Sequence, residues 1–199
     1  ISASGNSDVV TVDASALAET ATLTLSGSSA EVVTGLVGNL NVGGLTGSLN
    51  LTTGDATDNS FAITTGSGAT SITANGANDV VTINAAALVG SGWGSSPVLT
   101  LSGSAAETVT GLTADLNAAS LTGALNVTTG DASDNTIAIT TGSGVTSISA
   151  SGNSDVVTVN ASALAETATL TLSGSAAETL TGLVGNLAAG SLTGALSVT

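Results

Sequence analysis

The stretch that decides the fold is ISASGNSDVVTV at residues 1–12, because it returns as ITANGANDVVTI at 72–83 and again as ISASGNSDVVTV at 148–159. Self-similarity at a period of roughly 71–76 residues indicates a repeat architecture, in which stacked units share one continuous core. We therefore interpret the chain as one continuous domain, 1–199, with internal repeats at 1–71, 72–147 and, in part, 148–199.

The second long repeat carries an insertion loop at 90–97, within VGSGWGSSP, which makes it longer than the first and holds the only Trp, Trp93. Each long repeat also contains a shorter one: a short alternating strand, a Gly turn with an acidic residue, and a second alternating strand. The turn acids recur with a period of about 24 residues, as expected of stacked units. These acids are Asp8, Glu31, Asp55, Asp79, Glu107, Asp131, Asp155 and Glu178.

Short runs that alternate apolar and polar residues between Gly-rich turns predict strands. A unit of about 24 residues with two or three such strands cannot bury its own apolar face, so the units must stack. We predict an all-β parallel β-solenoid, similar to a β-helix or β-roll, with about eight coils of roughly 24 residues grouped in threes. The predicted inward residues are Val10, Val12, Leu23, Leu25, Val33, Leu49, Leu51, Phe61 and Ile63.

The composition excludes several classes of function. The 199 residues include 42% hydrophobic residues but no Lys, Arg, His or Cys, and the net charge is −14. Nucleic acids and anionic lipids are bound chiefly by Lys and Arg, so neither is an expected partner. No run is long enough for a membrane-spanning helix, so membrane insertion is not expected. Most catalytic side chains are also missing, and we expect no enzymatic activity.

Uncompensated carboxylates at equivalent turns point to a cation. Stacked about 5 Å apart, two such charges repel by roughly 3 kcal/mol at an effective dielectric constant near 20. Carboxylate, amide and main-chain oxygens are ligands suited to Ca²⁺. The strongest candidates are the GDATDN and GDASDN turns, and weaker ones are GNSD, GAND and the second GNSD. The candidate metal ligands are Asp55, Asp58, Asn59, Asp131, Asp134, Asn135, Asp8, Asp79, Asp155, Asn6, Asn78 and Asn153.

An alternative interpretation leaves these turns without metal. Asp and Asn after Gly also form turns by bonding their own backbone, and the charge then serves solubility. Glu31, Glu107 and Glu178 have no second acid in their turns, and we expect them to be solvated or auxiliary. Paired carboxylates can cleave glycosides, but the Asp55 and Asp58 pair recurs one repeat later, which is unlike a catalytic site.

The stretches at 4–12, 74–83 and 151–159 resemble the Gly-x-Asp-x-aliphatic turn and strand of the RTX-type calcium-binding β-roll repeats, and of related solenoids in bacterial S-layer proteins and giant secreted adhesins. This resemblance implies secretion to the cell surface, folding driven by extracellular calcium, and a role in surface layers or adhesion. Independently of this resemblance, Trp93 on the Gly/Ser-rich insertion loop is an aromatic of the kind that anchors a partner or a sugar. A carbohydrate or other cell-surface molecule is therefore a further expected partner, and the alternative is that Trp93 only covers the edge of the solenoid.

The sequence analysis leaves three functions open. The first is an extracellular structural or adhesive module, a calcium-stabilised solenoid belonging to a longer array and contacting itself or neighbouring repeats end to end or laterally. The second is a filament subunit that stacks end to end without calcium. The third is ice binding, suggested by a Thr three positions after the acid in six coils. These are Thr11, Thr34, Thr82, Thr110, Thr158 and Thr181.

Overall fold

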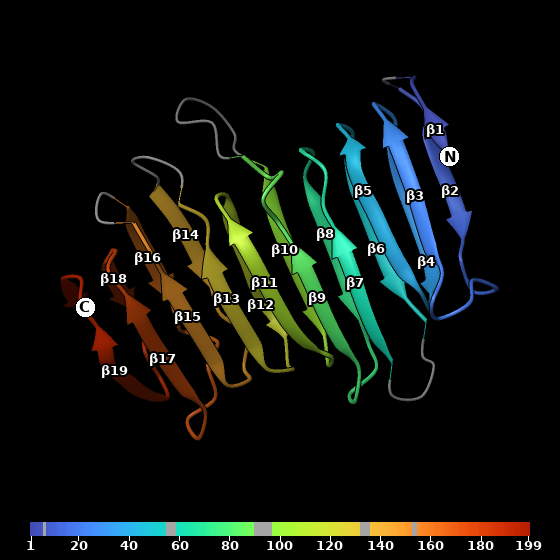
Figure 1. The fold of residues 1–199 in the computed structure, drawn as a ribbon. Coiled ribbons are helices and arrows are strands. Elements are labelled where there is room, and N and C mark those ends of the chain that lie inside the picture. The colour runs from blue at the N-terminus through green and yellow to red at the C-terminus, as the bar shows by residue number, and fades with distance from the viewer. Residues whose placement is uncertain (6, 55–58, 90–96, 132–135, 153–154) are drawn as a thin grey trace.

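The chain folds into two parallel β-sheets that lie face to face and share one core (Figure 1). A computed structural model describes residues 1–5, 7–54, 59–89, 97–131, 136–152 and 155–199. In this described part, successive strands alternate between the sheets, so one odd-numbered and one even-numbered strand make one coil. The prediction of an all-β parallel solenoid is confirmed.

The odd-numbered strands form what we call the odd sheet, and each pairs in parallel with the next odd strand. In order they are β1 (Ser2–Ala3), β3 (Thr22–Gly27), β5 (Asn39–Leu45), β7 (Ser60–Thr64), β9 (Val80–Asn84), β11 (Ala106–Leu112), β13 (Leu125–Thr129), β15 (Thr146–Ala150), β17 (Thr169–Gly174) and β19 (Asn186–Leu192).

The even-numbered strands form the even sheet in the same way. In order they are β2 (Val9–Asp13), β4 (Ala30–Leu36), β6 (Leu49–Thr53), β8 (Thr70–Ala74), β10 (Val98–Gly103), β12 (Asp115–Leu121), β14 (Thr136–Thr140), β16 (Val156–Asn160), β18 (Ala177–Thr181) and β20 (Leu196–Val198).

The coils are shorter and more numerous than predicted. Each sheet has ten strands in the described part of the chain, so nine turns separate its first strand from its last. A typical step takes Phe61 to its partner Val81, a sequence separation of 20, the same as that between Asn59 and Asp79. The step from Thr73 to its partner Ser102 has a separation of 29 because it includes the insertion loop. At about 4.8 Å per step, the strands span roughly 43 Å.

The long repeat corresponds to three and a half turns, and the predicted grouping in threes is wrong. The repeat that starts at residue 1 contributes the seven strands β1 to β7, and the repeat that starts at residue 72, within β8, contributes β8 to β14. Because seven is odd, equivalent strands change sheet: VVTV of β2 lies in the even sheet, VVTI of β9 in the odd sheet, and VVTV of β16 in the even sheet again.

The core is a set of aliphatic ladders that runs between the two sheets from Ala14 to Leu180. Alternate strand residues point inward, as period-2 strands require, so that Phe61 and Ile63 of β7 are each 1% exposed. Six of the predicted inward residues are buried, namely Leu25, Val33, Leu49, Leu51, Phe61 and Ile63, and Val12 and Leu23 pack partly buried against the core. No helix in the described part of the chain has the length and hydrophobicity to cross a bilayer.

Candidate functional site: buried carboxylates between coils

Three of the predicted metal ligands, Asp8, Asp79 and Asp155, occupy the same kind of turn. Each donates its backbone N–H to the carbonyl of the glycine three residues earlier, at 3.0, 3.0 and 3.1 Å. The Asp side chain folds back over that glycine, where a Cβ atom would overlap its carboxylate. Asp8 is exposed, whereas Asp79 and Asp155 are 1% and 2% exposed. The turn therefore directs the carboxylates of the two inner copies into the solenoid.

Asp79 also joins neighbouring coils. Its Oδ1 accepts a hydrogen bond from the backbone N–H of Asn59, one coil earlier, at 2.9 Å. The carbonyl of Asn59 accepts from Val80, and the carbonyl of Asp79 accepts from Ala106, one coil later. These hydrogen bonds therefore hold Asp79 between Asn59, just before β7, and Ala106, the first residue of β11. Its remaining oxygen, Oδ2, is buried with no hydrogen-bond partner among the described residues.

The three turn glutamates are buried, so the expectation that they are solvated is wrong. Glu31, Glu107 and Glu178 are 1%, 0% and 2% exposed. Strand alternation explains this result, since each Glu lies two residues before an inward aliphatic residue, as Glu107 does before Val109. The same alternation is visible in the sequence and could have identified their burial.

Each buried Glu replaces an aliphatic residue in an inward ladder. Glu107 of β11 pairs with Val81 on β9 and Leu125 on β13. Glu31 pairs with Val10 and Leu49, and Glu178 with Val157 and Leu196. Neither carboxylate oxygen of these glutamates has a hydrogen-bond partner in the described part of the protein.

Burial changes the protonation of these groups. Desolvation raises the pKa of Glu107 to about 8 and that of Glu178 to about 7, because an apolar environment disfavours the charged carboxylate. Desolvation also raises the pKa of Glu31, and the N-terminal ammonium group opposes that shift. A chain with no Lys, Arg or His offers these carboxylates no cationic side chain.

The acids do not form the continuous column that their regular spacing predicted. Because the coil is shorter than that spacing, successive acids occupy different positions relative to their strands. Asp79 and Glu107 lie on the odd sheet, whereas Asp8, Glu31, Asp155 and Glu178 lie on the even sheet. No group of three or more acidic side chains arranged to hold a metal occurs among the described residues.

The structure instead brings together a different set of residues, at the starts of β7, β9 and β11. Asn59 directly precedes β7, Asp79 directly precedes β9, and Glu107 is the second residue of β11. Ser60, Val80 and Ala106 pair in register, so the three residues belong to three successive coils of one sheet. Asn59 is itself buried, 6% exposed, and its Nδ2 has no partner among the described residues.

The Asp and Glu parts of this arrangement recur in the other repeats. Val157, two residues after Asp155, pairs with Glu178, and Val10, two residues after Asp8, pairs with Glu31. Of the other predicted ligands, Asn78 and Asp131 are exposed. The remaining ones lie outside the described residues: Asn6, Asp55, Asp58, Asp134, Asn135 and Asn153.

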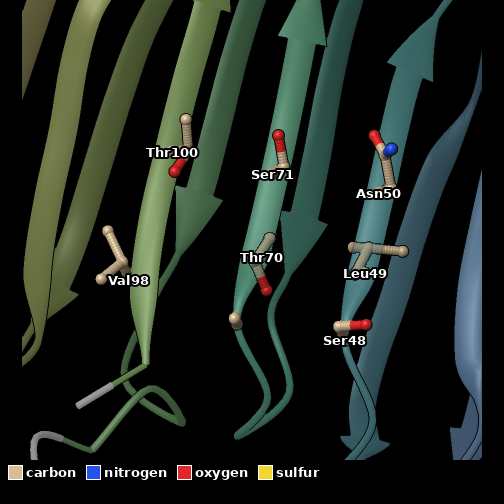
Figure 2. A pocket seen from close by; sticks show the side chains of 8 residues that line it. Ser48, Leu49, Asn50, Thr70, Ser71, Val98 and Thr100 are labelled. Carbon is tan, nitrogen blue, oxygen red and sulfur yellow. The ribbon is translucent and has the colours of Figure 1, made fainter. Parts of the chain in front are cut away.

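An open groove of about 300 Å³ lies on the outer face of the even sheet. Figure 2 shows Asn50, Ser71 and Thr100 on three neighbouring strands, β6, β8 and β10. The rest of its lining is Ser48, Leu49, Ala69, Thr70 and Val98. None of these side chains titrates near neutral pH, so the groove supplies hydroxyl and amide groups but no acid, base or metal-binding carboxylate.

The six threonines do not form one column. Thr11 of the even sheet pairs with Val32, and Thr34 on the next strand pairs with Asp13. Thr82 lies on the odd sheet, where it pairs with Ala62 and Thr108. The threonines that suggested ice binding are therefore divided between the two sheets.

No protein-family model, curated protein or solved structure matches this chain.

Proposed function

We propose that this protein is a structural or adhesive extracellular module: a rigid β-solenoid rod of a surface layer, fibre or giant adhesin, stabilised by calcium. The observation that carries the proposal is that the described residues form two ten-stranded parallel sheets around one aliphatic core. In such a solenoid each coil contacts mainly its neighbours, so stiffness and length come from repetition.

The surface fits a structural role better than a catalytic one. The groove on the even sheet contains no titratable side chain, and the carboxylates with raised pKa values are buried inside the core. A buried group that a substrate cannot reach does not act as its acid or base. We therefore propose no enzymatic activity, and assign the groove's hydroxyl and amide groups to contacts with a carbohydrate or neighbouring modules.

Calcium is the proposed stabilising ion. Buried carboxylates without cationic partners destabilise a fold, because desolvation of a charge costs several kcal/mol unless it is compensated. The orphaned oxygens of Asp79 and Glu107 are oxygen donors of the type that hard divalent cations prefer. An extracellular setting would supply such a cation continuously.

The first prediction concerns metal removal. Thermal unfolding of the 199-residue chain, followed by circular dichroism at low ionic strength, should show a higher Tm with excess Ca²⁺ than with chelator. Linkage gives about 2.7 kcal/mol of stabilisation at a ligand concentration about 100 times the Kd. Mg²⁺ at the same concentration controls for screening of the net charge. Equal melting temperatures in calcium and chelator would contradict calcium stabilisation.

A filament that stacks end to end without calcium is a second candidate. In the described chain, β1 and β19 each pair on one side only, as do β2 and β20. Such edges present unpaired backbone groups to another chain. Electron microscopy of the protein in chelator separates the two candidates, because only the filament forms rods much longer than about 43 Å, the span set by strand spacing, without metal.

A further inference from the structure

We propose that Asn59, Asp79 and Glu107 form a calcium-binding site inside the solenoid, bridging three successive coils. The inference rests on the proposed calcium-stabilised rod and names the residues that would hold the ion. It differs from a site within one Gly-rich turn, because its ligands come from β7, β9 and β11 or the residues just before them.

The three side chains share one inner corner of the odd sheet. The hydrogen bond from Asn59 N–H to Asp79 Oδ1, at 2.9 Å, fixes the first two positions relative to each other. Glu107 pairs with Val81, two residues after Asp79, on the adjoining strand. Neighbouring strands are about 4.8 Å apart, so long side chains at these diagonal positions are within reach of a common ion.

The donor set suits a hard cation. Asp79 contributes Oδ2, and Glu107 contributes two oxygens, all three buried without partners in the described structure. Asn59 is not acidic, yet it is also buried, and the orphaned end of its amide faces no hydrogen-bond acceptor among the described residues. The orientation of an amide group is assigned only from its hydrogen bonds. If this amide is rotated by half a turn, its oxygen takes the place of Nδ2 and faces the ion.

Charge balance favours a divalent ion at this corner. Two carboxylates are buried together in a chain that has no basic side chain. One Ca²⁺ neutralises both, and main-chain carbonyls and water complete the six to eight ligands that Ca²⁺ requires. Mg²⁺ is smaller and needs nearly ideal octahedral geometry, which a corner built from three separate strands does not readily provide.

The test is a calorimetric titration of the chelator-stripped 199-residue chain with CaCl2. The variants Glu107→Gln and Asp79→Asn each remove one charge with little change of shape, and the amide oxygen introduced by the second still offers an acceptor to Asn59 N–H. Asp13→Asn, at an exposed carboxylate, is the control with the same change in charge. We expect both site variants to bind one Ca²⁺ fewer per chain than the wild type, and the control to bind the same number.

Stability in chelator provides the second readout. Glu107→Gln and Asp79→Asn should both reduce the rise in Tm that calcium produces over the protein in chelator, and Asp13→Asn should leave that rise unchanged. If both site variants keep the wild-type calcium stoichiometry and Tm shift, the interior site is overturned and the calcium-stabilised rod stands. If the wild type binds no calcium, the inference falls together with calcium stabilisation, and the buried carboxyl groups are neutralised by protons alone.

Discussion

At the scale of single residues, carboxylate side chains differ in their surroundings according to the side of the strand that they face. Glu107 points inward because it is in phase with Val109, and the core then deprives it of water. Asp13, at the end of β2, is exposed, and its Oδ1 accepts a hydrogen bond from Ser15 N–H at 3.0 Å. Hydrogen bonds from Ser15 lower the pKa of Asp13, since they favour its charged form.

A residue-scale prediction follows from the equivalents of Asp13. Asn84 and Asn160 accept the same bond from the residue two positions later, both at 3.1 Å. The turn therefore needs a side-chain oxygen rather than a charge. Asp13→Asn should leave the free energy of unfolding within about 0.5 kcal/mol of wild type, and Asp13→Ala should lower it by about 1 kcal/mol. Urea denaturation measures both, and equal losses would contradict this account.

At the scale of elements, the strands β3, β10 and β17, which share the ending LTLSG, all end in a glycine with positive φ. The φ angles of Gly27, Gly103 and Gly174 are 119°, 109° and 107°, which other residues rarely adopt. A Cβ atom at Gly103 would also overlap the carbonyl oxygen of Ala74, one coil earlier. These glycines let the chain leave the strand while the coils remain in close contact.

The element-scale prediction is that Gly103→Ala destabilises the solenoid. Backbone strain alone costs about 1–3 kcal/mol, and the overlap with Ala74 adds to it. The matched control is Gly190→Ala, because nothing lies within 4 Å of a Cβ atom there. Chemical denaturation should show a large loss for the first variant and little change for the second. A similar loss in both would contradict the assignment of the effect to the native turn, because reduced flexibility of the unfolded chain on its own stabilises an alanine variant.

At the scale of the whole molecule, buried carboxyl groups link folding to pH. The strands beside Glu107 are β9 and β13, and the acids adjoining them are Asp79 and Asp131. No basic group on either strand offsets them. The folded protein therefore retains the Glu107 proton up to a pKa of about 8, whereas its ordinary value is 4.5.

The whole-molecule prediction concerns the metal-free protein. A raised carboxyl pKa means that the folded state binds more protons than the unfolded state, so stability falls as pH rises. The full stability is present below about pH 4.5, and the loss from Glu107 proceeds from there to about pH 8. Each pKa unit corresponds to about 1.4 kcal/mol. Urea midpoints in chelator from about pH 5 to 9 measure this loss, which Glu107→Gln should reduce; a flat wild-type profile would contradict it.

The sequence by itself determined the architecture. Alternation of apolar and polar residues specified strands, and their recurrence between Gly turns required stacked parallel coils, since one such unit cannot bury its own apolar face. It also identified inward residues such as Leu51 and Phe61. The turn acids could be recognised from the sequence as candidate metal ligands. The alternation that puts Glu107 on the same side of its strand as Val109 could also be read from the sequence.

Only the tertiary structure decided which acids lie on neighbouring strands. The sequence period of the acids is longer than a typical coil, such as the one in which Phe61 pairs with Val81. A repeat of seven strands moves equivalent residues from one sheet to the other, so Asp8 and Asp79 lie on opposite sheets, whereas Asn59, Asp79 and Glu107 lie at the starts of three adjoining strands of one sheet. The physical reason is that backbone pairing between coils decides which residues are neighbours in a solenoid. The length of each coil depends on its own turns, and the average sequence period does not show these individual lengths.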